Sequence, residues 1–437
     1  MIRDFWVRSW RIVRQLGLYL LLSLAILMSL IFSLALWQSP QRVLDAKPTN
    51  SKQQTLTNRS TGDIYDFSAL VLNQKNGMES VGDFRPLTDE IVKQVNDHKV
   101  KALHKQNLAE SDYLNNLQRE GTVVLAFPDQ VAGGIVNDIL GKQYRLPNNV
   151  GINYVQLDHK QDQITFYSTE QHAIYPYKVL EKSVALPTIE KQTHLTPVKW
   201  TKLAGKINLS YEQAVPMQRY RYLISNANMQ AYASSLFSDS KQVDSSQDAS
   251  GDTVYADGEN KRLVINPTAK MATFDVFNGQ KATPSLTKMM TTGYNTLNEI
   301  QQTGDNMNYF ASEDDGKTLL YRLNVDGLPI FNSDNLGTVK VQMVNSGHLE
   351  VAFSGTTLQV PLPVNDDDVV TIPSTAGALE WAGQIGVDTT KIEGLQIGYY
   401  WQTTDTDTVI LQPEWFYKYA GSWQILGTNP ANRTGGK

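Results

Sequence analysis

The sequence predicts an α+β protein: an N-terminal transmembrane helix followed by a multi-domain extracytoplasmic region of antiparallel sheets with packed helices. Three observations support this prediction. One long uncharged apolar segment lies near the N-terminus, the strands predicted beyond it follow one another in runs, and few helices separate consecutive strands. Runs of strands with segregated helices favour an α+β fold over a doubly wound parallel sheet. A chain of 437 residues is also too long for one ordinary core, so several domains are expected.

Composition excludes several function classes. The net charge of −5 gives no strong field for nucleic acid, and the absence of cysteine rules out disulfides, a thiol nucleophile and cysteine-bound metals. A mean hydropathy of −0.33 rules out a polytopic membrane protein. Neither of the glycine-rich phosphate-binding sequences GxGxxG and GxxxxGK[ST] occurs, and we expect no cofactor.

A transmembrane helix is predicted at residues 16–37, which contain no charged side chain. A helix of this length can cross a hydrocarbon layer of about 30 Å. Four arginines precede it, so the positive-inside rule places residues 1–15 in the cytoplasm and the bulk of the chain outside the cell membrane. A cleaved signal peptide is the alternative, because Ser33-Leu34-Ala35 resembles a cleavage site. The apolar segment is longer than a signal peptide needs, which favours a retained anchor.

Small residues recur every four positions in this segment, at Ala25, Ser29 and Ser33, with Trp37 next in the series. This spacing places them on one stripe of a helix, where small side chains let a second membrane helix approach closely. We therefore predict that Ala25, Ser29, Ser33 and Trp37 bind a partner helix. Chance spacing among common membrane residues is the alternative.

The polar residues 38–60 predict a linker, and four further segments follow it. They are an N-terminal extracytoplasmic domain at 61–150, a central α+β domain at 151–283, a connecting helix at 284–306 and a C-terminal α+β domain at 307–437.

Within these segments, alternating or short apolar runs bounded by turn residues predict strands, and apolar residues three or four apart predict helices. The main predicted strands are 66–72, 122–127, 151–157, 163–168, 198–203, 219–224, 253–256, 262–266, 271–277, 318–325, 339–344, 349–354, 395–402, 408–412 and 415–419. The predicted helices are 87–98, 109–119, 129–140, 226–237, 284–302 and 374–385. The polar residues 238–252 predict a loop.

The last two domains show a weak internal similarity. Val264-Ile265-Asn266-Pro267 and Ile410-Leu411-Gln412-Pro413 lie at matching places in the predicted order of helices and strands. A duplicated unit, with one helix on an antiparallel sheet, is the hypothesis that this similarity supports.

The best catalytic candidate is a penicillin-recognising serine site. Ser285 and Lys288 fit S-x-x-K at the start of a predicted helix, and Ser333-Asp334-Asn335 fits S-D-N. The third element of such enzymes, K-T-G, is absent, since Leu319 follows Lys317-Thr318. We therefore predict that the protein is not an enzyme.

The sequence contains no motif typical of a metal site or a glycosidase site. The six histidines form no H-E-x-x-H pair, so a zinc hydrolase is not expected. Asp366-Asp367-Asp368 and Glu313-Asp314-Asp315-Gly316 could contribute to a calcium site, but they lack the alternating ligands of an EF-hand loop and also fit exposed acidic turns. No metal site is predicted. The two carboxylates of a glycosidase can be neither found nor excluded by sequence.

Aromatic residues are dense near the C-terminus. They are Tyr399, Tyr400, Trp401, Trp415, Phe416, Tyr417, Tyr419 and Trp423. One interpretation is a stacking platform for a cell-wall glycan, and the other is a set of cross-strand pairs that stabilise a sheet.

The same region resembles the YycH family, also called WalH. Residues 397–402 (IGYYWQ) and 409–423 (VILQPEWFYKYAGSW) are similar to the terminal signature of that family, in which Pro-x-Trp and Gly-x-Trp follow an aromatic strand. Residues 321–332 (YRLNVDGLPIFN) resemble a hairpin shared with the sister family, YycI. The short N-terminal tail, single span and total length are also similar.

This resemblance implies a regulator. Members of the family lie in the membrane of low-GC Gram-positive bacteria beside YycI and the sensor histidine kinase WalK (YycG), and they modulate that kinase, whose response regulator WalR controls cell-wall genes. The resemblance also implies three extracytoplasmic domains, the last ones alike. The expected function is therefore non-enzymatic regulation of WalK, together with a YycI-like partner. A membrane-anchored wall-binding protein or wall hydrolase is the alternative.

Overall fold

The computed structural model describes Met28 and residues 59–181, 183–184, 194–227, 229–237, 242–277, 284–300, 306–363, 368–404 and 407–427. Nearly all of the described residues belong to the larger of two units, residues 58–437. The predicted span 16–37 lies outside the described residues except for Met28, which is helical. Among the described residues, no helix has the length and apolar character needed to cross a membrane.

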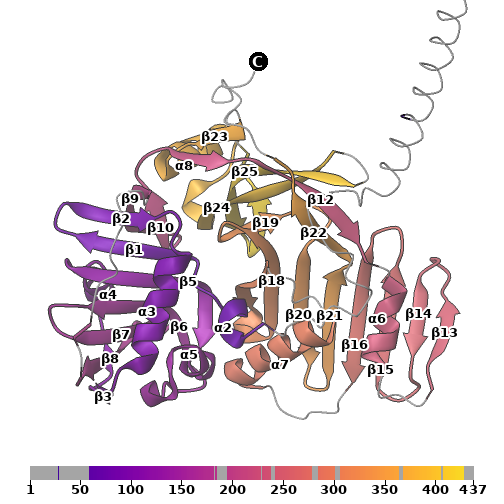
Figure 1. The fold of residues 1–437 in the computed structure, drawn as a ribbon, viewed down its shortest axis with the longest axis horizontal. Coiled ribbons are helices and arrows are strands. Elements are labelled where there is room, and N and C mark those ends of the chain that lie inside the picture. The colour runs from indigo at the N-terminus through magenta and orange to yellow at the C-terminus, as the bar shows by residue number, and fades with distance from the viewer. Residues whose placement is uncertain are drawn as a thin grey trace, which may run out of the picture. The chain divides into compact units, whose positions relative to one another are not determined.

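The first part of the larger unit is built on a ten-stranded sheet (Figure 1). Its strands are β1 (Ala69–Gln74), β2 (Gly77–Val81), β3 (Val100–Ala102), β4 (Gln106–Asn107), β5 (Thr122–Ala132), β6 (Gly151–Asp158), β7 (Gln163–Ser168), β8 (Ala173–Val179), β9 (Leu195–Leu203) and β10 (Lys206–Tyr211). They pair in the order β10-β9-β2-β1-β5-β6-β7-β8-β3, with β4 also on β8. All these pairings are antiparallel.

Helices cover both faces of this sheet. They are α2 (Thr61–Ile64), α3 (Arg85–Asp97), α4 (Glu110–Leu117) and α5 (Gly133–Leu140). Successive side chains of a strand point to opposite faces, so Leu70 and Leu72 of β1 join the core that includes α3 and α5. Val71, between them, joins a second core with Tyr113 and Leu117 of α4. Burial on both faces explains why this strand is a continuous apolar run.

The remaining part contains a fourteen-stranded sheet and a two-stranded one. The large sheet comprises β12 (Tyr220–Asn226), β13 (Asp244–Gln247), β14 (Thr253–Ala256), β15 (Lys261–Asn266), β16 (Met271–Phe277), β17 (Met307–Glu313), β18 (Thr318–Val325), β19 (Leu328–Phe331), β20 (Thr338–Asn345), β21 (His348–Ser354), β22 (Thr356–Pro361), β24 (Ile392–Thr403), β25 (Thr408–Tyr419) and β26 (Ser422–Ile425). The small sheet pairs β11 (Val215–Gln218) with β23 (Val369–Ile372). The helices are α6 (Met229–Leu236), α7 (Leu286–Glu299) and α8 (Thr375–Gln384).

The predicted α+β class is confirmed, because nearly all described strand pairs are antiparallel and the helices lie on the sheets. The large sheet runs in the order β13-β14-β15-β16-β21-β20-β18-β19-β24-β25-β12-β22, with β17 on β18 and β26 on β25. Its pair β19–β24 is parallel. The predicted strand pair at 151–157 and 163–168 forms the hairpin β6–β7.

Four predicted elements were wrong in part. The helix expected at 129–140 begins only at Gly133, because β5 continues to Ala132 through a register shift. The loop expected at 238–252 contains β13, which pairs with β14 through its backbone. Its four side chains are exposed and polar, so the sequence shows no apolar pattern that would predict a strand. Residues 408–419 form one strand, β25, not two.

Pro413 explains the last error, since a proline lacks the N–H that a strand interior normally uses. Strand β24 pairs with one edge of β25. Along the other edge, β12 pairs with residues 408–411 of β25 and β26 pairs with residues 416–419. Pro413 falls between these two ladders. The strand therefore passes through the proline without losing a partner on that side.

The internal duplication remains a prediction. Val264–Pro267 spans the end of β15 and the turn after it, whereas Ile410–Pro413 lies inside β25. The two tetrapeptides therefore lie at different places in the fold, and their similarity does not support the duplication hypothesis. The predicted domain boundaries likewise remain predictions.

Candidate functional site

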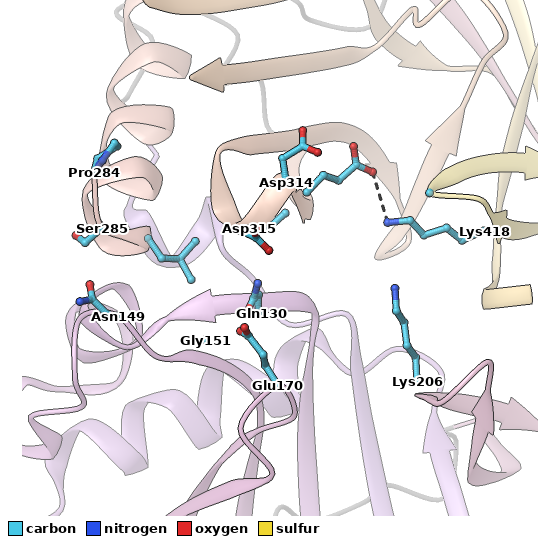
Figure 2. Close-up of a pocket in the computed structure, with 14 residues that line it drawn as sticks. Gln130, Asn149, Gly151, Glu170, Lys206, Pro284, Ser285, Asp314, Asp315 and Lys418 are labelled. Carbon is cyan, nitrogen blue, oxygen red and sulfur yellow. Dashed lines mark hydrogen bonds and ion pairs between the residues drawn. The ribbon is translucent and has the colours of Figure 1, made fainter. Parts of the chain in front are cut away.

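A polar cleft of about 820 Å³ lies between strands of the first sheet and elements that follow residue 284 (Figure 2). One wall carries Gln130 of β5, Gly151 of β6, Glu170 of the β7–β8 turn and Lys206 of β10. The opposite wall carries Ser285 before α7, Ser312 and Glu313 of β17, Asp314 and Asp315 of a 3-10 turn, and Lys418 of β25. The cleft thus collects polar groups that are far apart in sequence.

Asp129, beside the cleft, holds the two walls together. Its carboxylate accepts the backbone N–H of Gln130 at 2.7 Å and that of Ser312, on the opposite wall, at 2.9 Å. Burial raises the pKa of this carboxyl despite both hydrogen bonds. The Tyr309 hydroxyl adds a second link between the walls, donating to the Gln130 carbonyl at 2.8 Å. Hydrogen bonds therefore hold the two walls together, and the Asp129 carboxylate that accepts one of them is shielded from solvent.

The two lysines of the cleft are both paired. Lys418 Nζ lies 3.5 Å from Glu313 Oε1, and Lys206 Nζ lies 3.0 Å from Glu393 Oε2. The hydrogen bond from Lys206, and a second one from the Gly421 N–H, lower the pKa of Glu393. In Figure 2 the two ammonium groups approach each other from opposite walls at one end of the cleft.

Apart from Glu313, the acidic residues that line the cleft, which are Glu170, Asp314 and Asp315, form no ion pair with any described residue. Glu170 and Asp315 point toward each other from opposite walls in Figure 2. The Asp314 carboxylate accepts only the Thr318 hydroxyl, at 2.9 Å. The cleft is therefore bipolar, with two lysines that each pair with one carboxylate at one end and carboxylates without a described cation partner at the other.

The serine candidate has a structural explanation. Ser285 caps α7, and its Oγ accepts the backbone N–H of Lys288 at 3.2 Å. An N-cap and the third helical residue share the spacing of S-x-x-K, so the cap accounts for the pattern. The structure gives no contact between the Lys288 ammonium group, which is exposed, and the Ser285 hydroxyl. Ser333-Asp334-Asn335 lies in the turn between β19 and β20 and lines no part of the cleft.

The acidic candidates separate. Glu313, Asp314 and Asp315 line the cleft, whereas Asp368 is buried and pairs with Arg219 at 2.7 Å and Arg221 at 3.5 Å. Asp366 and Asp367 lie outside the described residues. Across the described ranges, no group of three acidic or histidine side chains is arranged to hold a metal ion.

The C-terminal aromatic residues are mostly core residues. Tyr399, Trp401, Trp415 and Phe416 are at most 2% exposed, so these four cannot stack on an external glycan. Phe416 stacks on Phe331 with ring centroids 3.9 Å apart. This burial supports the sheet-packing interpretation.

The predicted partner-binding residues Ala25, Ser29, Ser33 and Trp37 lie outside the described residues, so their role stays a prediction. Sequence reasoning missed Gln130, Glu170, Lys206 and Lys418. Each is one polar residue in or beside a strand, and no local pattern distinguishes such residues from ordinary surface positions.

The described fold and cleft define a class of α+β protein in which predominantly antiparallel sheets flank a polar, bipolar cleft. A family model described as YycH protein, C-terminal domain, matches residues 209–429, which is just over half of the chain. The chain belongs to the YycH family. This confirms the resemblance seen in the sequence.

The fold is similar to that of a solved YycH structure. The crystal structure of YycH from Bacillus subtilis matches with a TM-score of 0.67 and 15% identity, over 85% of this chain and 98% of that one. An uncharacterized protein from Eubacterium rectale matches with a TM-score of 0.33 and 11% identity, over 52% of this chain and 88% of that one. No curated protein sequence gives a significant match. At 15% identity the Bacillus subtilis match shows a shared fold.

A second cleft, of about 770 Å³, lies where the described chain begins, and it includes Asp66. Burial raises the pKa of the Asp66 carboxyl from 3.8 to about 6, although Arg85, 3.8 Å away, opposes the shift. Folding therefore favours the protonated form of this group. The stability that the protonated Asp66 carboxyl contributes to the folded state is complete below about pH 4. It is lost as the pH rises through about 6, where this carboxyl ionises in the folded protein.

Asp66→Asn should consequently stabilise the protein at pH 7.5 by up to about 3 kcal/mol and have little effect below pH 4, since asparagine stays neutral. Urea unfolding of the variant and the wild type at both pH values measures the difference. Asp138→Asn, an exposed position in the same cleft, is the control. An Asp66→Asn effect that is independent of pH would contradict the prediction.

Proposed function

We propose that this protein is a membrane-anchored, non-enzymatic regulator of the histidine kinase WalK, acting with a YycI-like partner. Membership of the YycH family is the observation that carries the proposal. The match to the Bacillus subtilis YycH fold over most of both chains supports it. The uncharged segment 16–37 supplies a membrane anchor, with the compact unit 58–437 outside the cytoplasm.

Such a regulator acts by binding one conformation of the kinase better than the other. Its effect on kinase activity cannot exceed the difference between these two affinities. The segment 16–37 would pack against partner helices through Ala25, Ser29 and Ser33. The extracytoplasmic unit would stabilise the complex.

Purification of the full-length protein from native membranes should therefore bring down a histidine kinase. Solubilisation in mild detergent, affinity capture and mass spectrometry of the eluate test this expectation. An eluate with no histidine kinase, together with release of peptidoglycan fragments by the purified protein, would instead favour the wall-hydrolase alternative.

The helix stripe is tested by the double substitution Ala25→Leu with Ser29→Leu. We expect several-fold less co-purified kinase, because two leucines prevent the close helix approach that small residues allow. The matched control is Ser23→Leu with Ala35→Leu, which adds the same bulk about 120° around the helix. Equal loss in both variants would reject the stripe without rejecting regulation.

A further inference from the structure

The polar cleft has a charge arrangement that the regulatory proposal does not use. It is large enough for a small ligand, since ligand sites usually enclose about 300–1,000 Å³. Its walls come from both parts of the larger unit and are held together through Asp129. A molecule bound between them would therefore contact elements that are distant in sequence.

The carboxylate end offers two exposed acidic groups to a cation. Glu170 and Asp315 face each other across the cleft, and neither forms an ion pair with a described residue (Figure 2). Like charges brought together in this way repel, and an ammonium group placed between them would remove the repulsion and donate a charge-assisted hydrogen bond to each carboxylate. No described group of three ligands suits a metal ion, so an organic cation fits this end better.

The lysine end offers the opposite charge. Lys206 and Lys418 approach from opposite walls, each with only one carboxylate partner, at 3.0 and 3.5 Å. An ammonium group has three donors, so both lysines can also bind an anion placed between them. The cleft is also lined by Gln130, Asn149 and Ser312, whose side chains supply neutral donors and acceptors.

We propose that this cleft binds a short peptide with a free amino terminus and a free carboxylate. The ammonium group would lie between Glu170 and Asp315, the carboxylate between Lys206 and Lys418, and the amide groups along Gln130. This ligand satisfies both charged ends at once and suits the polar lining between them. The proposal is independent of kinase regulation, because it concerns binding to the protein alone.

Trialanine, N-acetyl-trialanine and trialanine amide are the probes, since they differ only in their terminal charges. Ligand-observed NMR with the full-length protein in nanodiscs should show saturable binding of trialanine at millimolar concentration or below. Blocking either end should weaken binding about tenfold, as expected when one charge-assisted contact is lost. Co-purification of the kinase is measured separately, so failure here and failure of the proposed function are distinguishable.

Variants assign the two ends. Glu170→Gln with Asp315→Asn should abolish the preference for trialanine over its N-acetylated form, and Lys206→Met should reduce the preference over the amide. Lys75→Met, an exposed position outside the cleft, is the control. The proposal is overturned if trialanine shows no saturable binding, if all three peptides bind equally, or if the cleft variants behave like the control. Thermal unfolding of each variant verifies that the fold is retained.

Discussion

Replacement of Trp415 by alanine is expected to lower the free energy of unfolding by about 3–5 kcal/mol. Trp415 is completely buried in the core beside α8, and its indole N–H donates to the Pro373 carbonyl at 2.9 Å. The ring also meets Tyr211 edge to face, with centroids 6.1 Å apart. Alanine would leave a cavity and an unpaired buried carbonyl, two costs that add to the lost apolar contact.

Urea unfolding followed by far-ultraviolet circular dichroism measures this loss. Tyr400→Ala is the matched control, because Tyr400 lies on the paired strand β24 but is only partly buried, so its replacement should cost distinctly less. A Trp415→Ala protein that keeps its stability but no longer binds cell-wall glycan would contradict the core assignment. That outcome would restore the stacking-platform interpretation.

Burial patterns explain which parts of the fold the sequence predicts well. Strands such as β6 and β7 combine apolar runs with a polar turn, so their pairing follows from local signals. Strand β13 has four exposed side chains, and its strand conformation comes from backbone pairing with β14. Because backbone pairing does not depend on buried side chains here, β13 has no alternation of apolar and polar residues by which a sequence pattern could identify a strand.

The cleft was beyond local prediction for a related reason. One hydrogen bond between its walls joins the N–H of Ser312 to Asp129, 183 residues earlier in the chain. The sequence around either residue contains no signal that the two lie close together in the fold. Ser285 shows the converse problem, since helix capping and catalysis place a serine and a lysine at the same spacing. Family membership, by contrast, was predictable, because it rests on contiguous C-terminal motifs.

The second large effect is expected where α7 packs on β18. Gly293 of α7 is buried, and a methyl group there would overlap the Tyr321 hydroxyl oxygen. The Tyr65 hydroxyl donates to the Met290 carbonyl at 2.6 Å, so in its 2.7 Å contact with Tyr321 it must accept. The tyrosine hydroxyls are therefore held in place and cannot yield. Gly293→Ala should lower the free energy of unfolding by about 2–3 kcal/mol, although alanine favours helices.

Gly383, in α8, provides the matched control, because a methyl group there meets no atom within 4 Å. Gly383→Ala should raise the free energy of unfolding by up to about 1 kcal/mol through helix propensity alone. A double-mutant cycle then identifies the cause of the Gly293→Ala loss. Tyr321→Phe removes the overlapping oxygen, so it should cost less in the Gly293→Ala background than in the wild type. Additive effects of the two substitutions would mean that the hydroxyl does not oppose the methyl group, and that α7 tolerates the added carbon by shifting as a whole.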